Sequence, residues 1–206
     1  MRMSSLSAGR RPGVRRALAG TCGMAAGLAV FLLLERSVTP RYVLVTPVDA
    51  HIPFIDWSWF VYVSFFPFVI TLAACARQAS FDTFRDAVLI AFVGGLVCFL
   101  LLPEAVPRPD VAAIGNAFVR HRLARMWRLD LAGNGLPSLH VAVTCLACSI
   151  LPAHRYRAIA CMVGLLICVS TLTLKQHTVA DVLGGLLLAA ASKYWSERRS
   201  MRRSVA

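Results

Sequence analysis

The chain has 206 residues, and 58% of them are apolar against 16% that are charged. Soluble domains contain about 45–50% apolar residues even with glycine counted, and about 25% charged residues, so this composition excludes an ordinary soluble fold. The net charge of +12 at pH 7 would suit nucleic-acid binding, but the basic residues flank apolar segments and do not alternate with exposed aromatic side chains. We therefore expect lipid phosphate, and not nucleic acid, as the anionic partner.

Six apolar segments hold half of the chain and almost none of its charge. They are residues 17–34, 58–76, 87–103, 137–153, 158–174 and 178–192. Of 32 charged residues, only Asp181 lies inside them. A helix needs about 20 apolar residues to cross the hydrocarbon core, with a range of about 17–25, and the last segment reaches this if Lys193 extends to the interface. The sequence predicts an all-α, polytopic membrane protein, a bundle of six transmembrane helices.

The apolar segments divide the chain into three parts. We expect a basic cytoplasmic N-terminal tail at 1–16, a six-span membrane domain at 17–195 and a basic cytoplasmic C-terminal tail at 196–206. Segment 17–34 follows four arginines, as a signal peptide does, but has no clear small-x-small cleavage site, so we expect it to be retained. The tails and even-numbered loops hold 14 of the 22 Lys and Arg residues, which places both termini in the cytoplasm. We expect an integral protein of a bacterial inner (plasma) membrane.

The third loop, residues 104–136, departs from this bias because it carries five arginines on the expected outer, periplasmic side. In segment 116–129, Arg122, Arg125 and Arg128 fall on one side of a helix that also presents apolar residues. Such a pattern is typical of a helix lying in the membrane interface. We predict an interfacial helix here, and both substrate contact and simple anchoring of the loop remain open as its role.

Polar groups at the junction of the fifth and sixth apolar segments are the strongest candidates for chemistry. His177 and Asp181 are four residues apart, so they share a face if both lie in the opening turns of one helix. An acidic group inside a membrane segment is a functional hypothesis by default. A carboxylate that takes the proton of one imidazole nitrogen makes the other nitrogen more nucleophilic. We expect Asp181 to orient His177 in this way, and the alternative is that it only caps a helix or bonds within the bundle.

Two other segments place polar groups at the ends of apolar segments. In GNGLPSLH (133–140), glycines precede a proline suited to the first helical turn, and the N–H groups of that helix end form an anion site beside Ser138 and His140. His140 is either a proton donor or a tolerated interfacial histidine. The proline-rich segment 102–109 holds Arg108 in a stiffened turn that suits phosphate binding.

These three segments fall on one side of the membrane in a six-span arrangement. The third span ends there, and the fourth and sixth begin there, so Arg108, His140 and His177 are expected to lie close together. Each also stands at a span end, where lipid phosphate and water are both within reach. We therefore expect a single site that collects anionic head groups.

The three segments resemble the signature of the type 2 phosphatidic acid phosphatase superfamily, whose members are integral-membrane lipid phosphatases and phosphotransferases. That signature is Lys-x6-Arg-Pro, then Pro-Ser-x-His, then Ser-Arg-x5-His-x3-Asp. The second part is complete as PSLH at 137–140, and Ser170, His177 and Asp181 keep the spacing of the third. Leu101 replaces the first Lys, and Thr171 replaces the Arg of the third part. The Lys175-Gln176-His177 form is instead similar to the inositol phosphorylceramide synthase branch, with Lys175 suited to replace the missing Arg.

The resemblance implies a two-step displacement that needs no metal ion or other cofactor. His177 attacks phosphorus to form a phosphohistidine, Asp181 orients it, and His140 protonates the departing oxygen. Phosphate binding is assigned to Arg108, Lys175, Ser138 and Leu139, the last two at a helix end. The sequence itself offers no carboxylate cluster for a metal, and its seven cysteines lie inside apolar segments without the spacing of a zinc site.

Four functions are compatible with these residues. The leading one is hydrolysis of a phosphomonoester or diphosphate lipid on the outer membrane face. A head-group transferase of the inositol phosphorylceramide synthase type shares the intermediate and differs only in what resolves it. An intramembrane serine protease would use Ser138 and His177, but the Gly-x-Ser-Gly context is missing and Asp181 would have no role. A non-catalytic transporter or scaffold is the remaining alternative, and oligomeric state is not predicted.

Overall fold

The computed structural model describes residues 5–151 and 155–205, and this part of the chain is helical without regular strands. The helices are α1 (Ser5–Ser37), α2 (Pro47–His51), α3 (Ser58–Val63), α4 (Phe65–Cys75), α5 (Gln78–Leu101), α6 (Ala117–Leu129), α7 (Leu139–Ser149), α8 (Arg155–Thr173) and α9 (Val179–Val205), with a 3-10 turn at Val111–Ala113. The all-α prediction is confirmed. The basic segments expected as tails are helical where they are described, since α1 begins at Ser5 and α9 continues to Val205.

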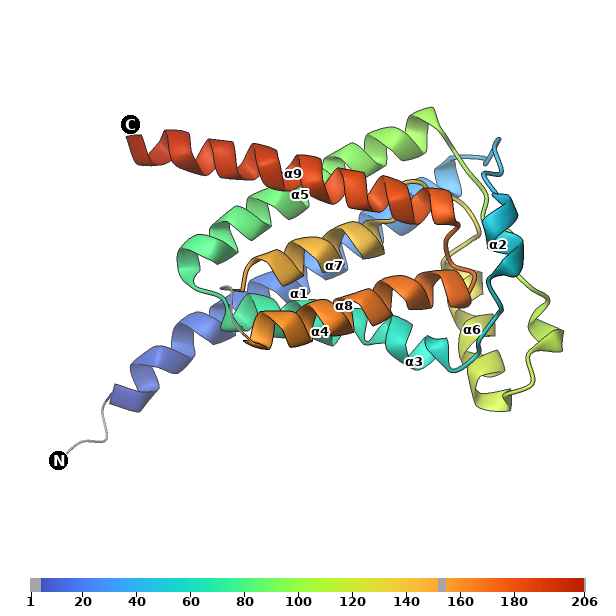
Figure 1. The fold of residues 1–206 in the computed structure, drawn as a ribbon, viewed down its shortest axis with the longest axis horizontal. Helices are drawn as coiled ribbons and strands as arrows, with labels where there is room; N and C mark the ends of the chain where they lie inside the picture. Colours follow the sequence, from blue (N-terminus) through green and yellow to red (C-terminus); the bar gives the residue numbers. More distant parts are fainter. Residues whose placement is uncertain (1–4, 152–154, 206) are drawn as a thin grey trace.

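The long helices run up and down through one bundle (Figure 1). The ends of α1, α5 and α8 and the starts of α3, α7 and α9 lie at one end of it, together with α2 and α6. The start of α1 and the end of α9 lie at the opposite end. We refer to the first of these as the loop end, because the segments 38–57, 102–138 and 174–178 all lie there.

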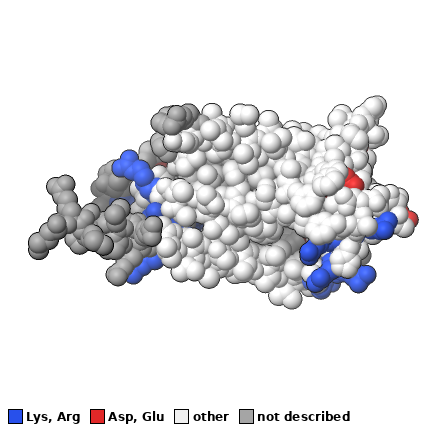
Figure 2. All heavy atoms as spheres, turned by 90° about the horizontal axis from the view of Figure 1, so that it is seen from below, with Lys and Arg blue, Asp and Glu red and all other residues white. Residues whose placement is uncertain are grey.

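Four helical segments are long and apolar enough to cross a membrane, among residues 5–151 and 155–205. They are Pro12–Ser37, Ser58–Cys75, Gln78–Leu101 and Tyr156–Thr173. The predicted fourth span is the shorter apolar helix α7, and the predicted sixth corresponds to α9, which carries Asp181 and Lys193. Figure 2 shows Lys and Arg at the two ends of the visible face, with a long and almost uncharged stretch between them. This separation of charge is the pattern of a membrane protein.

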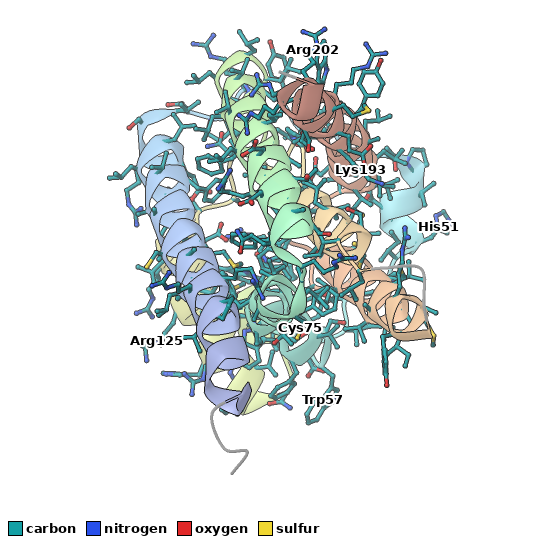
Figure 3. All side chains as sticks on the ribbon, turned by 90° about the vertical axis from the view of Figure 1, so that its left-hand side faces the viewer. His51, Trp57, Cys75, Arg125, Lys193 and Arg202 are labelled. Carbon is teal, nitrogen blue, oxygen red and sulfur yellow. The ribbon has the colours of Figure 1, made fainter. Side chains whose placement is uncertain are left out.

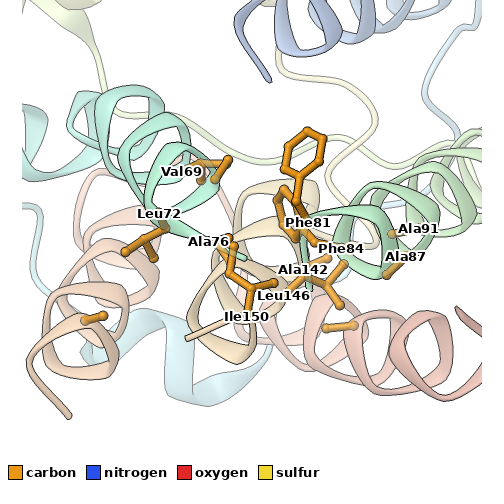
Figure 4. Packing of buried hydrophobic residues seen from close by; sticks show 14 of the residues in the cluster. Val69, Leu72, Ala76, Phe81, Phe84, Ala87, Ala91, Ala142, Leu146 and Ile150 are labelled. Carbon is orange, nitrogen blue, oxygen red and sulfur yellow. The ribbon is translucent and has the colours of Figure 1, made fainter. Parts of the chain in front are cut away.

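The core is formed where α4, α5 and α7 meet, and small residues let the helices approach closely (Figure 4). Ala87 and Ala91 of α5 and Ala142 of α7 are almost completely buried, as is usual where helices pack in membranes. Phe84 and Leu146 fill the remaining space beside them. Seen along the bundle in Figure 3, α5 lies between α1 and α9.

Helix α6 confirms the helix expected in the third loop, although its placement relative to a membrane stays a prediction. Asn116 caps its first turn by accepting a hydrogen bond from the Val119 N–H group at 3.1 Å. Val119 and Leu123 are buried against Tyr62 of α3. The arginines of α6 are exposed at the loop end of the bundle.

Candidate functional site

His177 and Asp181 meet at the start of α9, but in a different local structure from the one expected. The prediction that both lie in the opening turns of one helix is wrong, because α9 begins at Val179 and His177 precedes it. A capping box brings them together instead: the Thr178 N–H donates to Asp181 Oδ2 at 2.8 Å, and the Asp181 N–H donates to Thr178 Oγ1 at 3.3 Å. His177 Nδ1 then lies 3.3 Å from the same Asp181 Oδ2.

The turn that carries His177 is held by the last turn of α8. The main-chain N–H groups of Gln176 and His177 both donate to the Thr171 carbonyl, at 2.9 and 3.2 Å. Lys175 has a φ of 53°, a left-handed conformation that is common where a helix ends. The chain therefore reverses within a few residues and presents the His177 ring at the loop end.

His140 faces His177 from the first turn of α7. Their ring centroids are 6.4 Å apart and the ring planes differ by 54°. The His140 ring is stacked on Tyr62 at 4.5 Å and lies 4.1 Å from Phe65, and its buried Nε2 has no hydrogen-bond partner within the described part of the chain. The structure thus brings together the two histidines that the sequence placed in separate motifs.

Ser138 is the N-cap of α7, and its fully buried hydroxyl accepts a hydrogen bond from the Val141 N–H group at 3.3 Å. The expectation that Pro137 occupies the first helical turn is wrong, because α7 begins at Leu139 and Pro137 stands one residue before the cap. The N–H groups in the first turn of a helix have no partner within that helix. The N–H groups of Leu139 and His140 belong to this first turn of α7.

A close crossing of α7 and α9 connects the two motifs. The Ser138 N–H donates to the Asp181 carbonyl at 3.0 Å. A Cβ at Gly185 would stand 2.5 Å from the Ser138 carbonyl oxygen, and one at Gly184 would stand 2.7 Å from the Leu136 side chain. At Gly185 only glycine leaves enough room for the PSLH segment to lie against α9, because the atom in the way belongs to the main chain.

The guanidinium of Arg108 is bound to Asp130, a residue of the loop end. Its Nη1 donates to the Asp130 carbonyl at 2.7 Å, and its Nη2 to the Asp130 carboxylate at 3.0 Å. The guanidinium carbon also lies 5.4 Å from the Trp127 ring centroid, a cation–π contact. The Arg108 Nε is buried without a partner within the described residues.

Lys175 is held by the chain preceding α3. Its ammonium donates to the carbonyl oxygens of Asp49 and Ile52, at 2.9 and 2.6 Å. The Asp49 carboxylate in turn accepts the Val179 N–H at 2.8 Å. Burial opposes ionisation of Asp49, but hydrogen bonds from Thr46 and Val179 lower the pKa of its carboxyl below the ordinary value. Residues 46–52 therefore form hydrogen bonds both with the Lys175 side chain, before His177, and with the Val179 N–H, after it.

Glu104 is a further carboxyl group that borders Asp181. It is completely buried, and its Oε1 accepts a hydrogen bond from the Leu44 N–H at 3.3 Å. A Cβ at Gly135 would stand 2.8 Å from Asp181 Oδ2 and 3.2 Å from Glu104 Oε2. Burial, together with the hydrogen bond and the negative charge of Asp181, raises the pKa of Glu104 to about 9.

Sequence reasoning missed Glu104, Asp49, Tyr62 and Glu35 as parts of this region. Glu35, near the end of α1, accepts hydrogen bonds from the N–H groups of Leu131 and Gly133 at 2.9 and 3.2 Å. A charged residue directly at the end of an apolar segment is a weak signal that Glu35 and Glu104 share. Asp49 and Tyr62 carried no signal, because their roles depend on contacts with segments more than 75 residues away.

Buried polar atoms without a partner in the described residues are concentrated around this site. They include Glu104 Oε2, Arg108 Nε, Trp127 Nε1, both polar atoms of the Asn134 side chain, His140 Nε2, Gln176 Oε1 and Asp181 Oδ1. Buried polar groups are normally paired, so this concentration marks a place built to receive a polar ligand. Within residues 5–151 and 155–205, no group of three or more His, Cys, Asp and Glu side chains is arranged to hold a metal ion.

The fold and the site together define a helical membrane protein with a His–Asp pair and a second histidine at one end of its bundle. A family model of the PAP2 superfamily matches residues 31–195, and the chain belongs to that superfamily. The family assignment made from the motifs is thereby confirmed. Members of the superfamily are generally phosphatases or phosphotransferases. Searches of the curated proteins and of the solved structures find no match.

Proposed function

We propose that the chain is a membrane lipid-phosphate phosphatase that hydrolyses a phosphomonoester or diphosphate lipid through a phosphohistidine intermediate. The observation that carries this proposal is the juxtaposition of two histidine rings 6.4 Å apart, one of them held by a buried carboxylate. Two imidazole rings at this centroid separation can act on one phosphoryl group, one ring as nucleophile and the other as acid. Membership of the PAP2 superfamily supports the same class of reaction.

In the first step, Nε2 of His177 attacks phosphorus. Asp181 accepts a hydrogen bond from the Nδ1–H of the same ring, so the lone pair of Nε2 is available and the positive charge that develops on the ring is stabilised. The Nε2–P bond forms as the bond from phosphorus to the lipid oxygen breaks. His140 gives its proton to that oxygen, and the anionic phosphate supplies the countercharge that protonated His140 needs between Tyr62 and Phe65.

In the second step, water attacks the phosphohistidine. His140, now neutral, takes a proton from the water molecule as the new O–P bond forms and the Nε2–P bond breaks. Inorganic phosphate leaves, and His140 is protonated again for the next cycle. The reaction as written balances without a metal ion or cofactor.

The proposed phosphate ligands are Arg108, Lys175, Ser138 and Leu139. Arg108 and Lys175 now donate to protein oxygens, so phosphate binding would exchange some of those partners for phosphate oxygens. The unpartnered Nε of Arg108 is available without any exchange. Leu139 and Ser138 would contribute from the positive end of the α7 dipole.

We propose six membrane passes, with both ends of the chain in the cytoplasm and the site on the periplasmic face of a bacterial inner membrane. The start of α1 and the end of α9 lie at the same end of the bundle, opposite the loop end (Figure 1), which agrees with an even number of passes. The bias of Lys and Arg toward the tails and the even-numbered loops supports this orientation. Exposed arginines on α6 would then face anionic head groups at the outer surface.

A head-group transferase of the inositol phosphorylceramide synthase type is the second candidate. The Lys175-Gln176-His177 sequence favours it, because this form is similar to that branch of the superfamily. The transferase would share the first step and use an acceptor hydroxyl in place of water in the second.

The two candidates are separated by the products of one incubation. Purified protein is mixed with radiolabelled phosphatidic acid or polyprenyl diphosphate, with and without an inositol lipid or diacylglycerol acceptor. Inorganic phosphate as the only labelled product supports the phosphatase and excludes the transferase. Label found in a new lipid only when acceptor is present reverses that conclusion, and no turnover of either substrate contradicts both.

A protease using Ser138 is disfavoured by the role of that side chain. Its hydroxyl caps α7 and is fully buried, whereas a serine nucleophile needs a hydrogen bond to its general base. If the chain is a phosphatase, Ser138→Ala should only lower the rate of phosphate release. If it were a protease, the same change would abolish proteolysis.

A further inference from the structure

We propose that Glu104 is protonated at neutral pH and donates a hydrogen bond to the Asp181 carboxylate. Glu104 is thereby the positioning residue of the His177–Asp181 pair. The proposal rests on the function proposed for that pair. It assigns a task to a buried carboxyl group that the two-step mechanism does not use.

Geometry places the two carboxyl groups side by side. The side chains of Glu104 and Asp181 are both completely buried. A Cβ at Gly135 would stand 2.8 Å from Asp181 Oδ2 and 3.2 Å from Glu104 Oε2, so the two carboxyl groups border the same small space. Glu104 Oε2 has no hydrogen-bond partner among the described residues. A proton on Glu104, shared with the Asp181 carboxylate, would supply that partner.

The balance of charge requires that proton. Two ionised carboxylates in a buried contact repel each other strongly, and one of them normally retains its proton. No Lys or Arg among the described residues forms an ion pair with Glu104 or Asp181. The other titratable groups facing this pair are Asp49, whose negative charge disfavours a second anion, and His177.

The hydrogen bonds of each group decide which one holds the proton. Asp181 Oδ2 accepts the Thr178 N–H and faces His177 Nδ1, and both contacts stabilise a carboxylate. From the described part of the chain, the Glu104 carboxyl group receives one N–H hydrogen bond, the longer one from Leu44. Glu104 is therefore the acid and Asp181 the anion.

A proton donated by Glu104 fixes the rotation of the Asp181 carboxylate. With Glu104 donating to the Asp181 carboxylate as well as the Thr178 N–H, that carboxylate cannot turn away from His177. When Glu104 loses its proton at high pH, the contact becomes repulsive and the support of His177 is lost. Activity should consequently fall on the alkaline side, near the pKa of about 9 that burial and Asp181 produce for Glu104.

The test compares Glu104→Gln with Glu104→Leu in the purified, full-length protein. The glutamine amide donates to Asp181 and accepts from Leu44 but cannot ionise, so Glu104→Gln should retain most of the wild-type kcat and lose the alkaline fall. Glu104→Leu removes the donor, and kcat should drop roughly 10- to 100-fold with a smaller change in KM, as when the hydrogen-bond partner that orients a metal-bound side chain is removed. Glu197→Gln, an exposed position on α9, is the matched control and should keep the wild-type pH profile.

A readout that does not need activity separates this proposal from the proposed function. The infrared difference spectrum of wild type minus Glu104→Gln at pH 7 should contain the band of one protonated carboxyl group. If that difference band is missing, or if Glu104→Gln loses as much kcat as Glu104→Leu, the proposal is wrong. If no lipid phosphate is hydrolysed but the band behaves as expected, only the function assigned to the pair is wrong.

Discussion

At the residue scale, the orientation of His177 depends on three short contacts. Its main chain is bound to the Thr171 carbonyl, its Nδ1 faces Asp181, and the Asp181 carboxylate is fixed by the Thr178 N–H. Nε2 is left as the nitrogen that can react, because Nδ1 is occupied.

The first prediction concerns the nucleophile and its carboxylate. His177→Ala should eliminate turnover, and Asp181→Asn should lower kcat by roughly 10³- to 10⁴-fold because the wrong tautomer of His177 is favoured. Both are measured as release of radiolabelled phosphate, with acid-labile label on the protein as a second readout. Turnover that survives His177→Ala would exclude the phosphohistidine mechanism.

The second prediction concerns the pH dependence of stability. The folded-state pKa of Glu104 is raised from 4.5 to about 9, by burial first and by Asp181 second. A group with a raised folded-state pKa contributes stability that is complete below pH 4.5 and is lost as the pH rises toward 9. The unfolding temperature in detergent should therefore fall over this range, and should fall less in Glu104→Gln. Parallel curves for the two proteins would contradict the assignment.

At the element scale, the crossing of α7 and α9 determines how the two motifs meet. Gly184 and Gly185 allow the PSLH segment to approach α9, and the hydrogen bond from the Ser138 N–H to the Asp181 carbonyl fixes the register. Gly95 of α5 adds space on the other side, where a Cβ would stand 2.8 Å from the Leu139 side chain. Close approach at small residues is the usual packing mode of membrane helices.

The third prediction tests this crossing with Gly185→Ala. The new methyl group would stand 2.5 Å from the Ser138 carbonyl, so the start of α7 must move and His140 moves with it. We expect a loss of stability of about 1–3 kcal/mol from overpacking and a lower kcat. Gly23→Ala on α1 is the control, because a Cβ there meets nothing within 4 Å. Equal kcat for the two variants would show that the crossing does not position the site.

The fourth prediction concerns α6 and lipid charge. Replacing Arg122, Arg125 and Arg128 by Gln removes exposed cations near the proposed outer surface, each worth about 1 kcal/mol at an anionic membrane. KM should rise in vesicles rich in anionic lipid and change little in neutral detergent. The same loss of activity in both media would indicate a structural role for the arginines.

At the scale of the whole molecule, the two ends of the bundle differ in what they carry. One end holds the proposed site and the loops that cover it, and the other holds the start of α1 and the end of α9 (Figure 1). Lys and Arg gather at both ends of the face seen in Figure 2. A membrane protein with this polarity offers its site to one side of the bilayer only.

The fifth prediction is the orientation of the bundle. Arg125→Cys on α6 should react with a membrane-impermeant maleimide in intact cells, whereas Arg202→Cys on α9 should react only after the membrane is opened. The wild-type protein, with its seven cysteines, gives the background. Labelling of Arg202→Cys alone in intact cells would reverse the orientation, and labelling of both would exclude an opposed placement of the two ends.

The sequence by itself determined the membrane class, the superfamily and the two histidines and carboxylate of the motifs. The membrane class depends on composition, because helices buried in lipid must be apolar. The motifs depend on the spacing of a few polar residues along the chain, because phosphoryl transfer needs those residue types. The spacing of His177 and Asp181 predicted their contact correctly but for the wrong reason, since a capping box satisfies the same separation as a helical turn.

Only the tertiary structure decided what surrounds the motif residues. It placed Lys175 on carbonyl oxygens more than 120 residues away, Arg108 on Asp130, and Glu104 against Asp181. Side chains in loops have no periodicity that reports their partners, and long-range hydrogen bonds are chosen by how the helices pack. The physical reason is that a buried polar group takes whichever partner the fold brings within reach.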